Sequence, residues 1–216
     1  MRRQEIIVFD MDGVLVEVSE SYRETICRTV GHFTGRKPAR ELVQEYKNRG
    51  GFNNDWLLSQ TIARDFGAEV AYEVVIEKFN SIFYGDGLMS RERWIPANGL
   101  LEDLGRQFGL AIFTGRSRQE ANITLRRFAR DIAFDPFIGA EDVIKGKPDP
   151  EGLLKISAMH PEAKLLYIGD TVDDARSSQA AGVPFIGIGV AQRDLFENAV
   201  AVLENVNQLP AVVNRP

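Results

Sequence analysis

Five short apolar runs, separated by stretches with helical patterning, limit the folds open to this chain. Each run is continuous rather than alternating, which is typical of a strand covered on both faces in a parallel sheet. The runs occupy residues 5–9, 110–113, 137–139, 165–168 and 185–188. Because parallel neighbours require right-handed crossover connections, the pattern predicts an α/β fold: a Rossmann-like, doubly wound parallel sheet with helices on both faces.

Local signals indicate where some connecting helices begin and end. Ser117 and Glu120 have the spacing of a capping box, and Asp149-Pro150 predicts an N-cap followed by a proline at the first helical position. Gly182 is expected to end another helix. These signals place helices between the predicted strands.

The stretch from residue 16 to residue 94 has a different pattern. It contains amphipathic helices and no convincing strand, and its apolar residues, such as Tyr22, Ile26, Val30 and Phe33, recur at helical spacing. We interpret these aromatic side chains as the core of a small helical bundle rather than as a cofactor site. The sequence therefore predicts two domains: an α/β core of residues 1–15 and 95–216, and a helical bundle of residues 16–94 inserted after the first strand.

Composition excludes several classes of partner. The 216 residues carry 26 Lys and Arg against 31 Asp and Glu, a formal net charge of −5, so no bulk positive field exists for nucleic acid or an anionic membrane. The single cysteine, Cys27, cannot form an internal disulfide, and we interpret it as a small buried side chain. Without a signal-peptide core or a run of about 18 apolar residues, the chain is expected to be soluble and cytoplasmic.

Polar side chains follow the predicted strands at the point where each strand ends. They are Asp10, Asp12, Thr114 and Asp170, joined by Asp173 and Asp174 a few residues later. In an open parallel sheet, ligands bind outside the carboxyl ends of the strands, because loops and helix N-termini converge there. We therefore expect these side chains to share one site.

Charge balance predicts a metal ion in that site. The acids that would share one cleft are Asp10, Asp12, Asp170 and Asp174, and the one positive charge is that of Lys147 in the motif GKPDP. Two like charges about 4 Å apart repel by about 4 kcal/mol at an effective dielectric constant of about 20. A divalent cation would relieve this repulsion, and an all-oxygen ligand set favours Mg²⁺.

Four motifs, in this order, resemble those of the haloacid dehalogenase-like (HAD) superfamily. They are DMDGV after the first strand, Thr114 after the second, Lys147 in GKPDP, and GDTVDD after a later strand. The resemblance covers roughly residues 5–15 and 96–190. The helical insertion directly after the first motif resembles subfamily I, with its phosphoglycolate phosphatases and β-phosphoglucomutases, and implies the HAD fold with a helical cap domain.

The resemblance implies a role for each motif residue. Asp10 would be the nucleophile that attacks phosphorus and becomes an aspartyl phosphate, and Asp12 would protonate the leaving alcohol and then activate the hydrolytic water. Thr114 would hydrogen-bond the phosphoryl oxygens, while Lys147 would neutralise them and hold Asp10.

The resemblance also implies a ligand set for Mg²⁺. Asp10, Asp170 and the backbone carbonyl of Asp12 would bind the ion, and Asp174 would support the ion or its waters. Asp173 could take this supporting place instead, and motif spacing favours Asp174.

Candidate substrate contacts lie in two segments. After the second strand, Gly115 and Arg116 follow Thr114; Arg116 is expected either to touch substrate or to pair with an acid of the helical insertion.

Within the insertion, residues 48–55 are rich in glycine and amides. Arg49, Asn53 and Asn54 are candidates to bind an anionic or hydroxylated group of the substrate. The alternative is that Asn54 or Asp55 merely caps the following helix.

The expected function is that of a Mg²⁺-dependent phosphatase acting on a small phosphorylated metabolite. A β-phosphoglucomutase-like phosphosugar mutase shares every motif and is the main alternative. A 2-haloacid dehalogenase should lack Asp12, and a non-catalytic phosphoacceptor receiver module carries its motifs in another order. No nucleic acid or membrane partner is expected, and the chain would be a monomer or a homodimer.

Overall fold

The computed structural model describes residues 4–213 and divides into two compact units. One, here the α/β unit, consists of Met1–Val16 and Trp94–Pro216; the other, the helical unit, is Glu17–Arg93. The outermost residues of the predicted core, 1–3 and 214–216, lie outside the described residues. That the two units are separate domains, with the helical one as a cap, stays a prediction.

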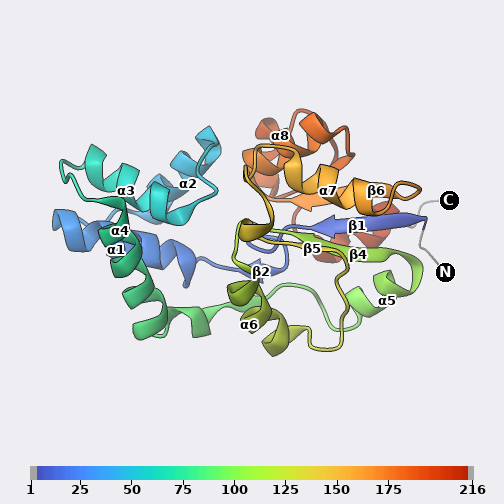
Figure 1. Ribbon diagram of the computed structural model, residues 1–216, viewed down its shortest axis with the longest axis horizontal. Helices are drawn as coiled ribbons and strands as arrows, with labels where there is room; N and C mark the ends of the chain where they lie inside the picture. Colours follow the sequence, from blue (N-terminus) through green and yellow to red (C-terminus); the bar gives the residue numbers. More distant parts are fainter. Residues whose placement is uncertain (1–3, 214–216) are drawn as a thin grey trace. The chain divides into compact units, whose positions relative to one another are not determined.

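A six-stranded sheet with all strands parallel forms the centre of the α/β unit (Figure 1). In spatial order the strands are β5 (Phe137–Ile138), β4 (Gly109–Phe113), β1 (Glu5–Phe9), β6 (Lys164–Gly169), β7 (Phe185–Ile188) and β8 (Ala199–Leu203). The predicted doubly wound parallel sheet is confirmed. The edge strand β8 is an addition that the sequence analysis did not predict.

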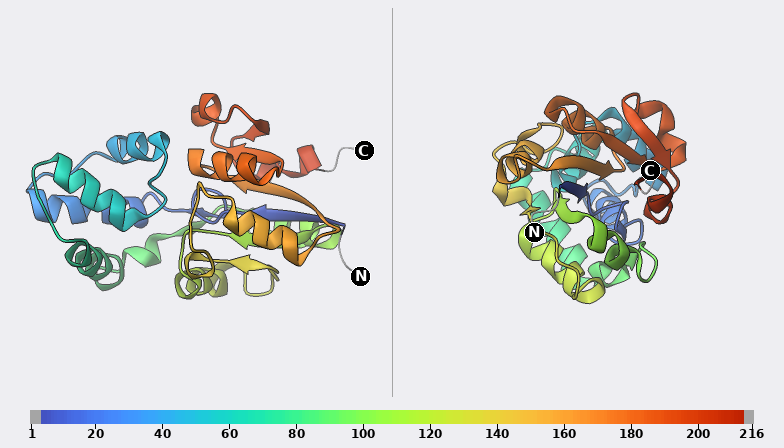
Figure 2. Two further views of the ribbon diagram at one scale, coloured as in Figure 1. Left: turned by 45° about the horizontal axis from the view of Figure 1, so that its top comes forward. Right: turned by 90° about the vertical axis from the view of Figure 1, so that its right-hand side faces the viewer.

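Helices cover both faces of this sheet. They are α5 (Leu100–Gln107), α6 (Arg118–Phe128), α7 (Glu151–Met159) and α8 (Val172–Ala181), with the short η3 (Ala140–Asp142), η4 (Val190–Leu195), η5 (Val206–Gln208) and α9 (Pro210–Val213). α5 and α6 lie on one face, and α7 and α8 lie on the other (Figures 1 and 2). Right-handed crossovers explain this division. α5 and α6 lie in connections that move outward from β1 through β4 to β5, whereas α7 and α8 lie in connections that run in the opposite direction, from β5 to β6 and on to β7.

The core between sheet and helices is apolar and closely packed. Val8, Phe113 and Phe185 belong to a single buried cluster, in which Tyr167 also lies fully buried. Gly152 of α7 fits against the ring of Phe113, where an added Cβ would lie closer than 3.0 Å to ring atoms.

The helix signals are confirmed at two of three places. Ser117 and Glu120 form a capping box at the start of α6, and Gly182, with a φ of 68°, ends α8. The predicted start of α7 is wrong by one residue, because Pro150 is the N-cap and the helix begins at Glu151. The Asp149 carboxylate still contributes there, since its Oδ1 accepts a hydrogen bond from the Glu151 N–H at 3.0 Å.

Short helices form the helical unit. They are α1 (Tyr22–Thr34), α2 (Arg40–Arg49), α3 (Asp55–Asp65), α4 (Tyr72–Asn80), η1 (Ser81–Gly85) and η2 (Leu88–Arg91). Tyr22, Phe79 and Phe83 are buried, and the rings of Tyr22 and Phe83 lie 4.3 Å apart. These aromatic side chains form the core, as the sequence analysis interpreted them, and Cys27 of α1 is likewise buried.

Two very short strands mark the ends of the helical unit. β2 (Val16–Glu17) pairs with β3 (Arg93–Trp94) in a two-stranded sheet. The expectation of no strand in residues 16–94 is therefore wrong at its ends, because a two-residue strand carries too little periodicity to be detected. The Trp94 ring stacks on Phe128 of α6, with ring centroids 5.7 Å apart.

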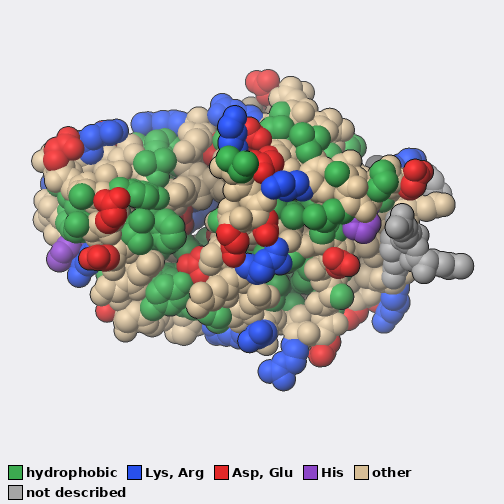
Figure 3. Space-filling view, viewed as in Figure 1, with side chains coloured by type: hydrophobic (Ala, Val, Ile, Leu, Met, Phe, Trp, Pro, Cys, Tyr) green, Lys and Arg blue, Asp and Glu red, His purple; other side chains and the backbone are tan. Residues whose placement is uncertain are grey.

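The surface bears charges of both signs. On the face shown in Figure 3, basic, acidic and hydrophobic side chains are interspersed rather than gathered by kind. None of the helices among residues 4–213 has the length and apolar character needed to cross a lipid bilayer.

Candidate functional site

The carboxyl ends of three adjacent strands position the predicted site residues. The Asp10 N–H donates to the carbonyl of Ile168 at 2.9 Å, and the Thr114 N–H donates to the carbonyl of Ile138 at 3.0 Å. These bonds extend the β1–β6 and β4–β5 ladders by one residue beyond each strand. The backbone at both residues is thus fixed by the sheet.

Three of the predicted acids meet at this edge of the sheet. Asp10, Asp170 and Asp174 each offer a carboxylate oxygen, and these oxygens lie within 4.8 Å of one another. Asp10 is 5% exposed and Asp174 is fully buried. We call these three residues the acid cluster.

The loop after β1 packs its backbone directly against this cluster. Gly13 has a φ of 76°, and a Cβ added to it would lie closer than 3.0 Å to Oδ2 of Asp170. Residue 13 of DMDG must therefore be glycine for two reasons: its backbone is left-handed, and the Asp170 carboxylate leaves no room for a side chain.

Lys147 bridges two members of the acid cluster. Its Nζ donates to Oδ1 of Asp10 at 2.8 Å and to Oδ1 of Asp174 at 2.7 Å, and its side chain is fully buried. The ammonium also lies 5.3 Å from the ring centroid of Phe113. A buried cation of this kind persists because its charge is matched by carboxylates on two sides.

Tyr167 of β6 completes this arrangement. Its hydroxyl donates to Oδ1 of Asp174 at 2.6 Å and accepts from Nζ of Lys147 at 3.1 Å. Tyr167 was not predicted as a site residue, because in the sequence it is one more apolar position of a strand. The available signal was its hydroxyl, since a buried tyrosine needs a hydrogen-bond partner.

The two oxygens of Asp174 have different partners. Oδ2 accepts from the N–H and the hydroxyl of Thr171, at 3.0 and 2.6 Å, in the capping box of α8. Oδ1 is bound by Lys147 and Tyr167. Asp173 is also buried, but its carboxylate is not part of the acid cluster; that Asp174 supports the metal ion stays a prediction.

Burial and charge set the ionisation of this site. Burial raises the pKa of Asp10 to about 7; the charge of Lys147 opposes this shift, and those of Asp174 and Asp12 add to it. Burial also acts upward on the pKa of Asp174, but the ammonium of Lys147 outweighs it and holds that pKa below its usual value. Burial acts downward on the pKa of Lys147, and the two carboxylates outweigh it and raise that pKa.

The donor set of the acid cluster fits a hard divalent cation. It consists of carboxylate oxygens alone, and once Asp10 has lost its proton, three ionised acids against one lysine give a net charge of −2. Oxygen ligands with excess negative charge suit Mg²⁺ rather than a softer metal. The carboxylate of Asp12 is not among the three, and metal binding by the backbone carbonyl of Asp12 stays a prediction.

The side chain of Asp12 instead pairs with Arg116. Oδ1 of Asp12 accepts from Nε of Arg116 at 2.8 Å and also from Nη2. The guanidinium is 2% exposed, and its Nη1 donates to the hydroxyl of Thr124 on α6 at 2.9 Å. The sequence predicted that Arg116 contacts either substrate or an acid of the helical insertion; its guanidinium instead pairs with Asp12 of the α/β unit.

A sequence model of the family described as haloacid dehalogenase-like hydrolase matches residues 7–188, which span the α/β unit's motifs and the helical unit. This chain belongs to that family. The predicted superfamily and the prediction of a hydrolase are confirmed.

Individual relatives of this hydrolase carry several names. A protein of Phytophthora nicotianae named imidazoleglycerol-phosphate dehydratase is 34% identical over 97% of this chain and 47% of its own length. The chain thus spans about half of that relative. A phosphoglycolate phosphatase of Haemophilus influenzae is 26% identical over 85% of this chain and 84% of its own.

The fold of this hydrolase is shared by solved structures. The crystal structure of a predicted phosphoglycolate phosphatase from Haemophilus somnus 129PT aligns with a TM-score of 0.80, covering 99% of each chain at 19% identity. At this identity the likeness shows the fold alone.

Two of the remaining candidates for substrate binding, Gly115 and Arg49, are exposed. Gly115 is exposed beside the buried Thr114. In the helical unit, Arg49 is exposed with its guanidinium 4.4 Å from the ring centroid of Tyr46. A substrate contact for Gly115 or Arg49 stays a prediction.

Asn54 acts as a helix cap, which is the alternative that the sequence left open. Its Oδ1 accepts from the Leu57 N–H at 3.0 Å, and its Nδ2 donates to the hydroxyl of Tyr72 at 2.9 Å. Asn53 is half-buried before this cap. Substrate binding by either asparagine stays a prediction.

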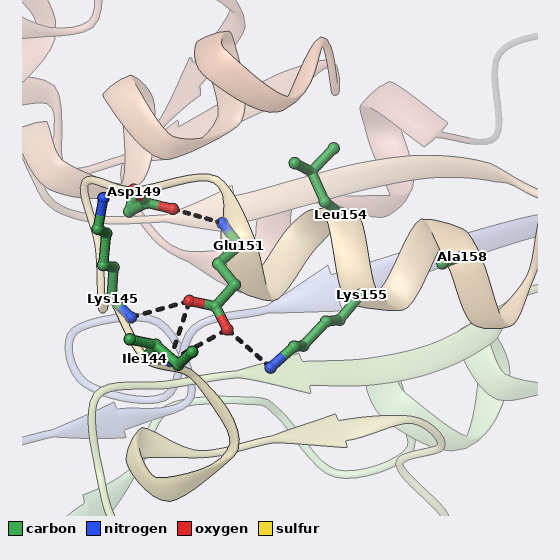
Figure 4. A pocket seen from close by; sticks show the side chains of 7 residues that line it. All are labelled: Ile144, Lys145, Asp149, Glu151, Leu154, Lys155 and Ala158. Atoms are coloured by element: carbon green, nitrogen blue, oxygen red, sulfur yellow. Dashed lines mark hydrogen bonds and ion pairs between the residues drawn. The ribbon is translucent and has the colours of Figure 1, made fainter.

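A surface pocket of about 520 Å³ lies elsewhere on the α/β unit (Figure 4). It is lined by Ile144, Lys145, Asp149, Glu151, Leu154, Lys155 and Ala158. The Glu151 carboxylate within it accepts from the N–H groups of Ile144 and Lys145 and pairs with Lys155. Because this acid is already satisfied and no member of the acid cluster lines the pocket, we do not assign the chemistry to it.

Proposed function

We propose that this HAD hydrolase is a Mg²⁺-dependent phosphatase that hydrolyses small phosphomonoesters through an aspartyl phosphate on Asp10. The observation that carries this proposal is the buried ammonium of Lys147 between Asp10 and Asp174, with Asp170 completing the acid cluster. The carboxylates of such a site would hold a cation, and the positive charge of Lys147 lies beside the Asp10 carboxylate that would attack the phosphate.

In the first step, a carboxylate oxygen of Asp10 attacks phosphorus. The bond between phosphorus and the ester oxygen breaks, and that oxygen leaves as the alcohol after it takes a proton from Asp12. The product is an aspartyl phosphate on Asp10. The ion pair with Lys147 holds the Asp10 carboxylate in place for this attack.

In the second step, Asp12 takes a proton from a water molecule whose oxygen attacks phosphorus. The bond between phosphorus and Asp10 breaks, and its electron pair returns to the Asp10 carboxylate. Inorganic phosphate is released, and Asp12 is protonated for the next cycle.

Two further side chains would stabilise the phosphoryl group. Lys147 supplies a positive charge beside the attacking Asp10. The hydroxyl oxygen of Thr114 accepts from the Arg116 N–H at 3.2 Å, so its own hydrogen remains to donate to a phosphoryl oxygen. Fixed donors of this kind act on the charge that develops in the transition state.

Asp10, Asp170 and the carbonyl of Asp12 would hold Mg²⁺, with Asp174 in a supporting place. The bound ion would neutralise charge on the transferring phosphoryl group. The presence of Asp12 also supports a phosphatase over a 2-haloacid dehalogenase, which has no need of a second acid.

The direct test measures phosphate release from 4-nitrophenyl phosphate with Mg²⁺ and with a chelator. We expect turnover that the chelator abolishes and that Asp10→Asn reduces at least about 1,000-fold. Asp131→Asn, a change at an exposed aspartate of the same unit, is the matched control and should retain activity. Full turnover by Asp10→Asn would overturn the proposed nucleophile.

A panel of metabolites then addresses the substrate. It includes phosphoglycolate and imidazoleglycerol phosphate, because relatives bear those names. The dehydratase reaction is not proposed for this chain, which matches about half of the relative with that name. A requirement for a sugar bisphosphate would instead identify a phosphosugar mutase. A cytoplasmic location and a monomeric or homodimeric state stay predictions.

A further inference from the structure

The Asp12 carboxylate is held asymmetrically. Both Nε and Nη2 of Arg116 donate to the same oxygen, Oδ1. In a bidentate arginine–carboxylate pair, each nitrogen would donate to a different oxygen. The hydrogen bonds to this carboxylate from the described residues all go to Oδ1. The Asp12 side chain is 34% exposed, and Oδ2 is the oxygen to which none of the described residues donates a hydrogen bond.

Arg116 is itself fixed from three directions. Its N–H donates to the hydroxyl of Thr114 at 3.2 Å, its carbonyl accepts from the Ala140 N–H at 2.9 Å, and its Nη1 donates to Thr124 at 2.9 Å. Gly139 also lies against the Arg116 carbonyl, since a Cβ added to this glycine would lie 3.1 Å from the carbonyl oxygen. The guanidinium therefore presents its Nε edge to Asp12 from a rigid support.

We infer that Arg116 is the positioning residue for Asp12: by holding Oδ1, it makes Oδ2 the oxygen that exchanges protons with the leaving group and the hydrolytic water. This inference rests on the proposed phosphatase function. It assigns to Arg116 a role through Asp12 rather than a contact with substrate. It also names the substrate class that depends on the pair, namely esters of alcohols whose oxygen must be protonated as it leaves.

Three phosphate esters of similar size separate this role from substrate binding. They are 4-nitrophenyl, phenyl and benzyl phosphate, whose leaving groups run from a stable phenolate to an alkoxide that needs a proton. The ratio kcat/KM covers the steps up to departure of the alcohol, so it reports proton donation without the later hydrolysis.

We expect Arg116→Gln to lower kcat/KM for benzyl phosphate about 100-fold and that for 4-nitrophenyl phosphate less than about threefold. With 4-nitrophenyl phosphate, kcat and KM should fall together, because hydrolysis of the aspartyl phosphate still needs Asp12 as a base. Nitrophenolate should then appear in a burst equal to the enzyme concentration. Equal losses of kcat/KM with all three esters would overturn the inference.

Matched variants complete the test. Arg126→Gln removes the same charge from an exposed position of α6 and should leave all three ratios unchanged. Arg116→Lys should recover part of the benzyl phosphate activity. In an Asp12→Asn background, Arg116→Gln should cause no further loss with benzyl phosphate, since a residue that acts through Asp12 has nothing left to position.

If Arg116→Gln fails to fold, Thr124→Val provides the measurement. It removes the hydrogen bond that holds Nη1 of Arg116 and should lower kcat/KM for benzyl phosphate about tenfold more than for 4-nitrophenyl phosphate. An equal loss with the two esters would contradict the inference.

A wild-type protein that releases phosphate from none of the esters would overturn the proposed function and this inference together. An active wild type, an inactive Asp10→Asn and a uniform loss in Arg116→Gln would overturn the inference alone.

Discussion

The backbone of Gly13 lies so close to the carboxylate of Asp170 that no side chain fits between them. An alanine at residue 13 would be strained by its positive φ and would push Oδ2 of Asp170 away from the acid cluster. We predict that Gly13→Ala weakens Mg²⁺ binding about 10- to 100-fold, as loss of a correctly oriented ligand does. Isothermal titration calorimetry with Mg²⁺ measures this change.

Gly182→Ala is the control for backbone strain. Gly182 has a similar φ of 68°, but nothing lies within 4 Å of an added Cβ. This variant should lose about 1 kcal/mol of unfolding free energy and bind Mg²⁺ normally. Equal Mg²⁺ affinity in both variants would contradict the role assigned to the Gly13–Asp170 contact.

Mg²⁺ binding should depend on pH through Asp10. Its pKa of about 7 in the metal-free protein means that a proton must leave before the carboxylate can bind the ion. We predict constant affinity above pH 7 and about a tenfold decrease for each unit below it. Calorimetry in buffers of different ionisation enthalpy should detect about one proton released per Mg²⁺ below pH 7.

The raised pKa of Asp10 also makes the stability of the metal-free fold depend on pH. The Asp10 carboxyl ionises near 3.8 in the unfolded chain and near 7 in the fold, so this group stabilises the metal-free fold most at acid pH. Its contribution falls as the pH rises from 3.8 to 7 and is constant above. Asp10→Asn should remove this pH dependence of both stability and Mg²⁺ affinity, and its persistence in that variant would assign it to another group.

Tyr167 should matter for both stability and activity. Phenylalanine at this position would deprive Asp174 of a donor and Lys147 of an acceptor while keeping the buried ring. We predict that Tyr167→Phe lowers the unfolding free energy by about 1–2 kcal/mol. We also expect kcat for 4-nitrophenyl phosphate to fall about tenfold, because Lys147 is less firmly placed.

Tyr46→Phe in the helical unit provides the comparison. It removes a similar hydrogen bond, from the Tyr46 hydroxyl to Asp65 at 2.6 Å. Denaturation should show a comparable loss of stability, and phosphate release should not change. If both variants lose activity equally, the effect of Tyr167 is one of general stability.

Glu24 should stabilise the helical unit in a pH-dependent way. Burial acts upward on its pKa, but Lys37 and Arg28 outweigh burial and lower that pKa to about 2. The unfolded carboxyl ionises near 4.5, so this stabilisation is complete above pH 4.5 and is lost as the pH falls toward 2. We predict that Glu24→Gln costs about 2 kcal/mol at pH 7 and almost nothing near pH 2.

Glu20 is the control for this measurement. It pairs with Arg40, but its side chain is 43% exposed against 7% for Glu24. Thermal denaturation should therefore show a much smaller loss of stability for Glu20→Gln than for Glu24→Gln, because solvent screens an exposed ion pair. Equal losses at the two positions would mean that burial of Glu24 adds nothing.

The features predicted from the sequence are those with local signals. Glu5–Phe9 and Phe185–Ile188 are continuous apolar runs, and both are strands with the expected bounds. β8 escaped prediction because Ala199–Leu203 is a partly exposed edge strand with two alanines and only a weak pattern. The acid cluster was predictable because a parallel sheet brings strand ends to one edge whatever the length of the connections.

Contacts that depend on side-chain direction could not be predicted in this way. Asp12 and Arg116 are 104 residues apart, and only the fold shows that the guanidinium turns toward Asp12 rather than toward solvent. Tyr167 and Lys147 meet for the same reason. A single sequence indicates which loops share an edge but not which polar groups within it form pairs.

The Asp174 carboxylate has a structural and a proposed chemical role at once, because its two oxygens accept hydrogen bonds from different partners. One oxygen starts α8, and the other anchors the lysine of the proposed active site. A substitution that removes both oxygens would therefore change two properties at once, since it takes a cap from the start of α8 and a carboxylate from Lys147. Because a helix cap contributes about 1 kcal/mol, any loss of chemistry through residue 174 would be accompanied by a loss of stability.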